Sequence, residues 1–318
     1  MRTAGPLAVS LLLALAPVTG AAKDIHVNNV DGDDSFAGRH DRNLSDQGGP
    51  VRTIARALQL ASQGDRIILA NTGRPYRESI TLTGSRHSGY SFRPFVIEGN
   101  GAILDGSAPV AAEAWDHYRG HVYRFRPPGL GHQQLFLDDR PLARVAADRR
   151  FDRPPELDPL TWCLYDGHIY FAVEPETLKL PKDYALSYAY LRTAITLFHV
   201  EGVGIVDLTV QGFQLDGINA FNSARDVTLA GLTCRGNGRS GITVGGASRV
   251  TIDACLLGDN GSAQLLTLPC SETAIRNTVL LSNAAPGWVD RGGRVYVDGR
   301  RVEGGLEELA PEAAAPKP

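Results

Sequence analysis

The feature that most constrains the fold is a repeat of 23 or 24 residues in the second half of the chain. Short segments that begin at Ile195, Ile218, Ile242 and Leu265 recur at spacings of 23, 24 and 23 residues. Each repeat holds short runs of β-branched and aliphatic residues interrupted by Gly, Asn and Asp, a pattern that favours β-strands. A unit of this size cannot bury its apolar side alone, so it must stack on its neighbours. The repeat therefore predicts a solenoid of parallel β-strands.

A second spaced feature supports stacked coils. Asn237, Asn260 and Asn283 recur at intervals of 23 residues, which places them at equivalent turns of three consecutive coils. Coils stack at the strand spacing of about 4.8 Å, so equivalent side chains lie next to each other. Asparagines in such a column can exchange amide hydrogen bonds, and we expect a ladder at this bend.

These repeats resemble those of a known superfamily. The segments Val227-Thr228-Leu229 and Val250-Thr251-Ile252 and the turn Asp216-Gly217-Ile218 look like the parallel β-helix repeats of the pectin-lyase-like superfamily. The resemblance implies an all-β fold, a right-handed parallel β-helix solenoid. It specifies the fold and leaves the function open, because members include lyases, hydrolases, epimerases and non-catalytic proteins.

The N-terminal half agrees with this resemblance. Residues 25–38 and 51–69 resemble the opening of secreted bacterial β-helix proteins, in which an amphipathic helix caps the first coil. Ile54, Ala57 and Leu58 have the spacing of one apolar helical face. Such a cap is needed because the end of a solenoid exposes both core and strand edges.

The repeat period disappears between about 111 and 185. Residues 135–144 and 162–171 read there as hairpin strands, similar to the small β-rich insertion of some β-helix glycoside hydrolases. The predicted organisation is a signal peptide (1–22), an N-terminal cap with the first coils (23–110), the insertion (111–185), the repeat coils (186–302) and a disordered tail (303–318).

The first residues indicate export. A basic start at Arg2, an apolar run of about 10 residues and small residues near Ala22 form a secretory signal, while a membrane span needs roughly 20 apolar residues. We therefore expect a secreted or periplasmic monomer without a membrane span. The net charge of -3 excludes a strongly basic nucleic-acid binder. The four cysteines lack zinc-site spacing, and either a disulfide or buried free thiols would suit them.

The repeats do not contain a complete catalytic motif. A lyase needs a base and a cation beside a uronate carboxylate; no lysine lies in the coils, so arginines such as Arg239 are the candidates. A hydrolase needs paired carboxylates. Asp216-Gly217 resembles the first part of the polygalacturonase motif, but Arg239-Ser240 stands where the family has its Asp pair. Asp216 is then a candidate acid or only a structural turn residue.

Two rows of side chains on the repeated strand could contact sugars. Thr196, Asn219 and Thr243 form one row of outward positions, and Phe198 and Phe221 form the next. Aromatic faces stack on sugar rings and amides or hydroxyls bond to them, unless another segment covers the row. His199 follows this row, and its imidazole would titrate near neutrality.

The leading hypothesis is an enzyme that cleaves glycosidic bonds of a polysaccharide in a groove across the stacked strands. Asp216, His199 and Arg239 are the candidate catalytic residues, with Phe198, Asn219, Phe221 and Thr243 as candidate substrate contacts. The alternative is a carbohydrate-binding or cell-surface structural β-helix without turnover. No metal site is expected in the repeats, although the acidic loop at Asp31–Asp34 could hold calcium or be a plain turn.

Overall fold

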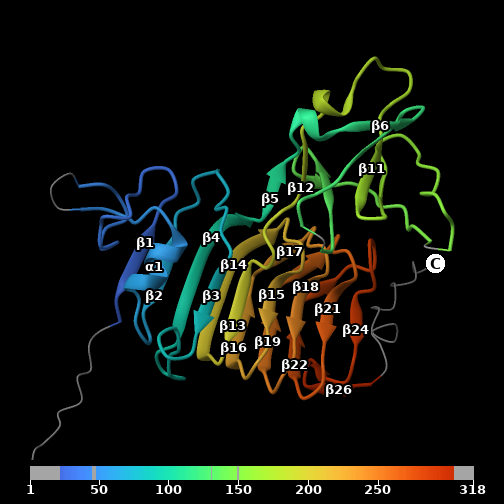
Figure 1. The fold of residues 1–318 in the computed structure, drawn as a ribbon. Helices are drawn as coiled ribbons and strands as arrows, with labels where there is room; N and C mark the ends of the chain where they lie inside the picture. Colours follow the sequence, from blue (N-terminus) through green and yellow to red (C-terminus); the bar gives the residue numbers. More distant parts are fainter. Residues whose placement is uncertain (1–21, 45–47, 130, 149, 304–318) are drawn as a thin grey trace, which may run out of the picture.

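Two long sheets of parallel strands run along the stacked coils (Figure 1). The computed structural model describes residues 22–44, 48–129, 131–148 and 150–303. Nearly all of the predicted signal peptide and of the predicted disordered tail therefore lies outside the described residues. The coils follow one another in sequence order from the blue end of the stack to its red end, as a parallel β-helix requires.

The larger sheet has twelve strands, parallel from β1 to β25. Its main path is β1 (Asp24–Val27), β2 (Arg66–Leu69), β4 (Phe95–Asp105), β14 (Glu201–Gln211), β16 (Arg225–Ala230), β19 (Arg249–Asp253), β22 (Glu272–Arg276), β25 (Arg294–Val297) and β26 (Arg300–Val302). Three further strands, β17 (Thr233–Arg235), β20 (Leu256–Gly258) and β23 (Val279–Leu280), continue from the second half of β14.

The second sheet carries the repeat that the sequence reveals. Its six strands are β3 (Ile80–Thr83), β13 (Ile195–Phe198), β15 (Asp216–Ala220), β18 (Ser240–Val244), β21 (Ala263–Thr267) and β24 (Trp288–Asp290). Ile195 pairs with Ile218, Ile218 with Ile242, and Ile242 with Leu265. All four are fully buried, so the predicted register and the parallel β-helix are confirmed.

The asparagine column is confirmed for two members and wrong for the third. Asn260 is fully buried, and its Oδ1 accepts from the backbone N and from Nδ2 of Asn237 at 2.9 and 3.0 Å. The Nδ2 of Asn260 then donates to Oε1 of Gln264 at 2.7 Å instead of continuing to Asn283. Asn283 is exposed and bonds to Asp259, because the last coil leaves its turn open to solvent.

A single α-helix among the described residues, α1 (Ile54–Leu60), packs on the first coils. Thr53 is its N-cap and accepts from Arg56 N at 3.0 Å. Its apolar face, including Ile54, Ala57 and Leu58, is buried in the same core as β1 and β2. No described helix is long and apolar enough to cross a membrane.

A segment of antiparallel strands interrupts the stack. The chain leaves the solenoid after the coil that contains β4 and returns to it in the next coil, since β4 pairs directly with β14. The segment stands to one side of the coils (Figure 1). Its two four-stranded sheets are β6 (Asp116–Arg119), β7 (Val122–Phe125), β10 (Trp162–Tyr165) and β11 (His168–Ala172), and β5 (Ser107–Pro109), β8 (Leu135–Leu137), β9 (Arg140–Pro141) and β12 (Leu186–Ala189).

The interior of this insertion is aromatic. Trp162 and Phe171 are fully buried, and Trp115 packs against Phe125 with ring centroids 4.7 Å apart. The two hairpins predicted at 135–144 and 162–171 appear as β8–β9 and β10–β11. The antiparallel strands reach slightly beyond the predicted limits of 111–185, from Ser107 to Ala189.

The four cysteines are free thiols. Cys163, Cys234 and Cys255 are buried, and burial raises the pKa of each, of Cys163 to about 12. These three side chains therefore behave as small apolar groups, Cys234 and Cys255 in the core of the coils and Cys163 in the insertion.

Candidate functional site

A cleft of about 1360 Å³ lies between the insertion and the turns of the coils. The insertion forms one wall with His132, Arg144 and Leu164, and the coils form the other with Tyr190, Arg192 and Gln214. The remaining lining residues are small, apolar or uncharged: Ser79, Pro128, Gly129, Gly131, Leu191, Leu215, Gly261 and Ser262. No Asp or Glu is among these described lining residues.

The floor of the cleft follows one column of the solenoid. Leu215 N donates to Arg192 O at 2.7 Å, Arg239 N to Leu215 O at 2.9 Å, and Ser262 N to Arg239 O at 2.8 Å. Arg192, Leu215 and Ser262 line the cleft, and Arg239 occupies the coil between the last two. The repeat thus sets the spacing of Arg192 and Arg239 along the floor at two coils.

Asp216 is next to this column and is fully buried. Its Oδ1 accepts from Arg239 Nε at 2.8 Å, from Ser240 Oγ at 2.8 Å and from Thr243 Oγ1 at 3.1 Å. Its Oδ2 accepts from Asn219 Nδ2 at 2.9 Å and from an Nη of Arg239. Five donors occupy this carboxylate, so neither oxygen is left to contact a substrate.

The Asp216 bonds fix the Arg239 guanidinium, which belongs to the coil between the cleft-lining Leu215 and Ser262. Its hydrogen bonds to Asp216 raise the pKa of Arg239, and its side chain keeps 31% of its surface exposed. The Nη1 atom has no hydrogen-bond partner among the described residues. A guanidinium held by two nitrogens presents its remaining donors in a fixed direction, which suits binding of an anionic group.

His132 is brought to the cleft by the insertion. Its loop contacts the coils closely at Gly238, where a Cβ atom would lie only 2.8 Å from His132 O and 2.4 Å from Gln214 O. The cleft walls partly desolvate the imidazole and, together with Arg239 and Arg144, lower the pKa of His132, while Asp216 opposes this. No hydrogen bond to the ring is formed within the described residues. A histidine without an internal partner and with a lowered pKa can take up a proton from a ligand near neutral pH.

Two arginines that line the cleft lack anionic partners among the described residues. Arg192 and Arg144 are both reached by solvent, and neither guanidinium forms an ion pair there. The positive potential around His132 therefore has no lining carboxylate to balance it. Unpaired arginines in a concave site are typical of sites for carboxylate, phosphate or sulfate groups.

The structure brings together some of the residues that the sequence singles out. Asp216, Arg239, Asn219 and Thr243 form one network, although Thr243 is buried and bonded to Asp216, so it is not accessible as the expected substrate contact. The expected row itself is confirmed, because Thr196 pairs with Asn219 and Asn219 with Thr243.

Other candidates lie elsewhere. His199 follows the last residue of β13, whereas Asp216 starts β15 beside Ala194. Strands rise about 3.3 Å per residue, so His199 is roughly 20 Å from Asp216 and is not part of the same site. Phe198 and Phe221 are 42% and 40% exposed at this far end, and Phe198 packs against the His199 ring with centroids 4.3 Å apart.

Sequence reasoning missed His132, Arg144 and Arg192 as site residues. Arg192 could have been found, because it is two repeats before Arg239 in the same column. His132 and Arg144 carry no repeat signal, since they belong to the insertion. Only the packing of the insertion on the coils brings His132 close to Arg239 and Arg144 close to His132.

The acidic loop at Asp31–Asp34 is tied to the backbone instead of forming a calcium cage. Asp34 Oδ1 accepts from Arg52 N and Thr53 N at 2.8 and 2.9 Å, and Asp33 accepts from Ser35 N. Within the described residues no group of three or more His, Cys, Asp or Glu side chains could hold a metal ion. The side chains of this loop therefore do not fit calcium.

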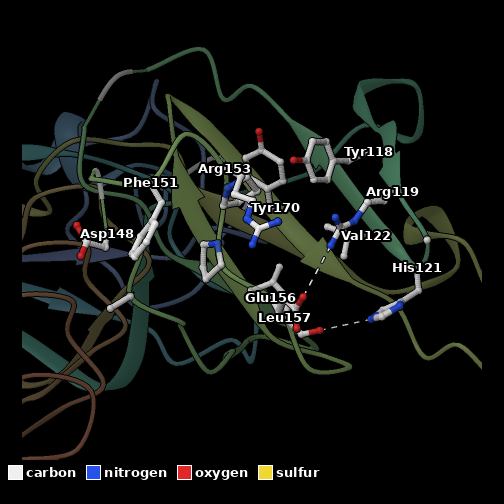
Figure 2. Close-up of a pocket in the computed structure, with 14 residues that line it drawn as sticks. Tyr118, Arg119, His121, Val122, Asp148, Phe151, Arg153, Glu156, Leu157 and Tyr170 are labelled. Atoms are coloured by element: carbon white, nitrogen blue, oxygen red, sulfur yellow. Dashed lines mark hydrogen bonds and ion pairs between the residues drawn. The ribbon is translucent and has the colours of Figure 1, made fainter.

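Figure 2 shows another cavity, of about 660 Å³, on the insertion. Tyr118, Val122 and Tyr170 of the sheet face Phe151 and Glu156 of a loop across it. The exposed pair Arg119–Glu156 closes one side at 4.0 Å. None of its lining residues lines the cleft, so this cavity is separate from the candidate site.

Similarity to one solved structure supports the fold. No family model and no curated protein matches the chain. A solved structure described as a glycoside hydrolase is similar with a TM-score of 0.56 and 10% identity, over 83% of this chain and 74% of that chain. The GH136 lacto-N-biosidase from Eubacterium ramulus has a TM-score of 0.44 and 12% identity, over 80% of this chain and 41% of its own. Pectate lyase Pel9A has a TM-score of 0.30 and 9% identity, over 93% of this chain and 82% of its own.

Proposed function

We propose that this protein cleaves the glycosidic bonds of an acidic polysaccharide by β-elimination in the cleft between the insertion and the coils. The observation that carries the proposal is the position of His132, whose imidazole has no hydrogen-bond partner in the described residues, within a cleft that Arg144 and Arg192 also line. Arginine binds a uronate carboxylate, and a neutral histidine can remove the proton beside it.

The lining favours elimination over hydrolysis. Hydrolysis of a glycoside uses two carboxyl groups, one as acid and the other as base or nucleophile. None of the described lining residues is Asp or Glu, and both oxygens of Asp216 are occupied by donors. A lyase needs no second carboxylate, because the negative charge that develops lies on the substrate and is stabilised by cations.

The reaction would begin with a uronate carboxylate bound by Arg192 and by the free edge of Arg239. His132 takes the C5 proton, the C5–H electron pair forms the C4–C5 double bond, and the C4–O4 bond breaks. The leaving oxygen is protonated by water or by the hydroxyl of Tyr190, which lines the same cleft. Asp216, with Asn219 and Thr243, acts as a positioning group for Arg239.

The remaining expectations belong to the same proposal. Export to the periplasm or medium would bring the protein to its polysaccharide. Right-handed winding is the rule for parallel β-crossovers, and α1 would act as the cap of the first coil. Phe198 and Phe221 would form a separate sugar contact on the far end of the strands.

The proposal is tested by incubating the mature chain with polygalacturonate, alginate, hyaluronan and neutral xylan. New reducing ends and the ultraviolet absorbance of unsaturated sugars are followed together. We expect both signals on an acidic polymer, and neither signal with a folded His132→Gln variant. Reducing ends without unsaturated product would show hydrolysis instead. Binding of a polymer without any product would establish the non-catalytic carbohydrate-binding alternative.

A further inference from the structure

A second cavity, of about 570 Å³, lies next to the cleft and is built entirely from the insertion. It shares Gly129, Gly131, Arg144 and Leu164 with the cleft, so Arg144 stands at the boundary of the two. Its other lining residues are Pro127, Gln133, Ala147, Tyr165, Asp166 and Gly167. The geometry of the coils alone would not provide this cavity.

Arg144 is fixed by an aromatic side chain and not by an acid. Its guanidinium carbon lies 5.2 Å from the centre of the Trp162 ring, and Trp162 is itself fully buried with its Nε1 bonded to Leu142 O at 3.1 Å. The backbone of Arg144 bridges to Trp162 as well. The guanidinium has no ion pair or hydrogen bond to another described residue, so all its donors are available to a ligand.

No acid in the surroundings of Arg144 neutralises its charge among the described residues. Desolvation by the cavity walls lowers the pKa of Arg144, although the group stays protonated at neutral pH. Asp166 is the one carboxylate among the described lining residues of this cavity, and it forms no ion pair with Arg144. A solvent-accessible guanidinium that is held on an aromatic ring and has no internal partner can bind an incoming carboxylate or sulfate.

A second polar group in the same wall also lacks a partner. Gln133 is only 1% exposed, and its Nε2 donates to Gly129 O at 3.1 Å. Its Oε1 is buried and accepts no hydrogen bond from the described residues. Buried acceptors without donors are uncommon in folded proteins. The cavity wall thus contains an unsatisfied buried acceptor in addition to the unpaired Arg144.

We propose that Arg144 and this cavity form a second acidic-sugar subsite, contributed by the insertion and separate from the bond-cleaving centre. The inference rests on the proposed function and deepens it: the polymer carries an anionic group on more than one sugar unit. Arg192 on the coils binds one such group, and Arg144 on the insertion binds another. Arg144 is therefore a specificity-determining residue that selects polyanionic chains.

The test measures binding and turnover separately. Binding of polygalacturonate, dextran sulfate and neutral xylan is measured by calorimetry on the full mature chain carrying His132→Gln, with and without Arg144→Gln. The matched control is Arg124→Gln on β7, which removes another arginine stacked on a ring, 5.7 Å from the centre of Tyr118. Arg124 lines neither the cleft nor the 570 Å³ cavity. Thermal melting confirms that each variant is folded, and Arg144→Lys keeps the charge without the planar group.

Arg144→Gln should weaken binding of a polyanion roughly tenfold or more, which is the size of one charge-assisted contact, while Arg124→Gln should not change it. The affinity of Arg144→Lys for the polyanion should lie between those of Arg144→Gln and Arg124→Gln. In the active chain Arg144→Gln should raise KM for polymers and leave it unchanged for substrates with a single acidic unit. Comparison of the carboxylated and sulfated polymers identifies the anion.

The two proposals fail in distinguishable ways. Unsaturated product with an unchanged KM in Arg144→Gln would overturn the subsite and leave the reaction standing. Arg144-dependent binding without product from the active chain would overturn the reaction and leave the subsite standing. Equal affinity of polygalacturonate, dextran sulfate and xylan would overturn the subsite.

Discussion

The carboxylate of Asp216 and the guanidinium of Arg239 form a two-bond ion pair between consecutive coils, 23 residues apart. Asp216 is fully buried, and Arg239 keeps about a third of its side chain exposed. Ser240, Thr243 and Asn219 complete the shell around the acid. The buried partner therefore organises the wall, and the half-exposed partner remains available to a ligand.

Asp216→Ala should destabilise the fold by about 3 kcal/mol, because Arg239 loses its counter-charge and three polar side chains lose their acceptor. Glu272→Ala is the matched control. It removes an acid that also pairs with an arginine one coil away, Arg294 at 2.9 Å, but with both side chains solvent-accessible. That change should cost less than about 1 kcal/mol. Urea unfolding measures both, and equal losses would contradict the structural role of Asp216.

The repeat made the register of the coils predictable because each coil places the same apolar positions inward. The spacing from Ile195 to Leu265 fixes the strand pairing, and a shift by one residue would turn these side chains outward. The same spacing could predict that Asp216 and Arg239 lie close together, since Arg239 is one repeat further along. It could not predict that Asp216 would be saturated with donors, because this depends on side-chain directions within the coil.

The cleft could not be predicted from the repeat. His132 and Arg144 are in an insertion whose position on the solenoid depends on close contacts such as that at Gly238. The grouping of His199 with Asp216 fails for a related reason. Closeness in sequence gave no information on which end of a strand each residue occupies. His199 lies after the end of β13, whereas Asp216 lies at the start of β15.

The asparagine column gives a second test of stability. Asn260→Ala should destabilise the protein by about 3 kcal/mol, because Asn237 and Gln264 would lose their buried partner. Asn283→Ala, at the equivalent turn of the next coil, removes only exposed hydrogen bonds, to Asp259 and to Ala284 N, and should cost less than about 1 kcal/mol. Thermal or urea unfolding measures the loss of stability in both variants. Equal losses would contradict the structure and indicate a ladder in which all three asparagines contribute alike.

Stability should fall on acidification because of His87. This histidine is buried between α1 and β3, with Nδ1 accepting from Thr83 N and Nε2 donating to Leu58 O, both at 3.0 Å. Burial lowers the pKa of His87, so the unfolded chain binds its proton first. The contribution of His87 to the free energy of unfolding is then fully present above about pH 6.5. It decreases below that pH, by up to about 1.4 kcal/mol per pH unit.

His87→Gln should flatten this dependence between about pH 6.5 and the lowered pKa. His168→Gln is the control, because that ring lies in the insertion near the surface and bonds only to Asp166 O within the described residues. Denaturant unfolding at a series of pH values measures the slopes. An unchanged slope in His87→Gln would assign the acid sensitivity to other groups.

The titration of His132 tests the electrostatics of the cleft independently of any substrate. Desolvation, Arg239 and Arg144 lower the pKa of His132, and Asp216 raises it. Removing a positive neighbour in Arg144→Gln should therefore raise the pKa, and removing the negative charge in Asp216→Asn should lower it further. Both are measured from the imidazole resonances by NMR, with His132→Gln to assign the signal. If His132 is the base, the acidic limb of the activity profile must move to higher pH in Arg144→Gln by the same amount. A limb that stays in place while the resonance moves would show that another group removes the proton.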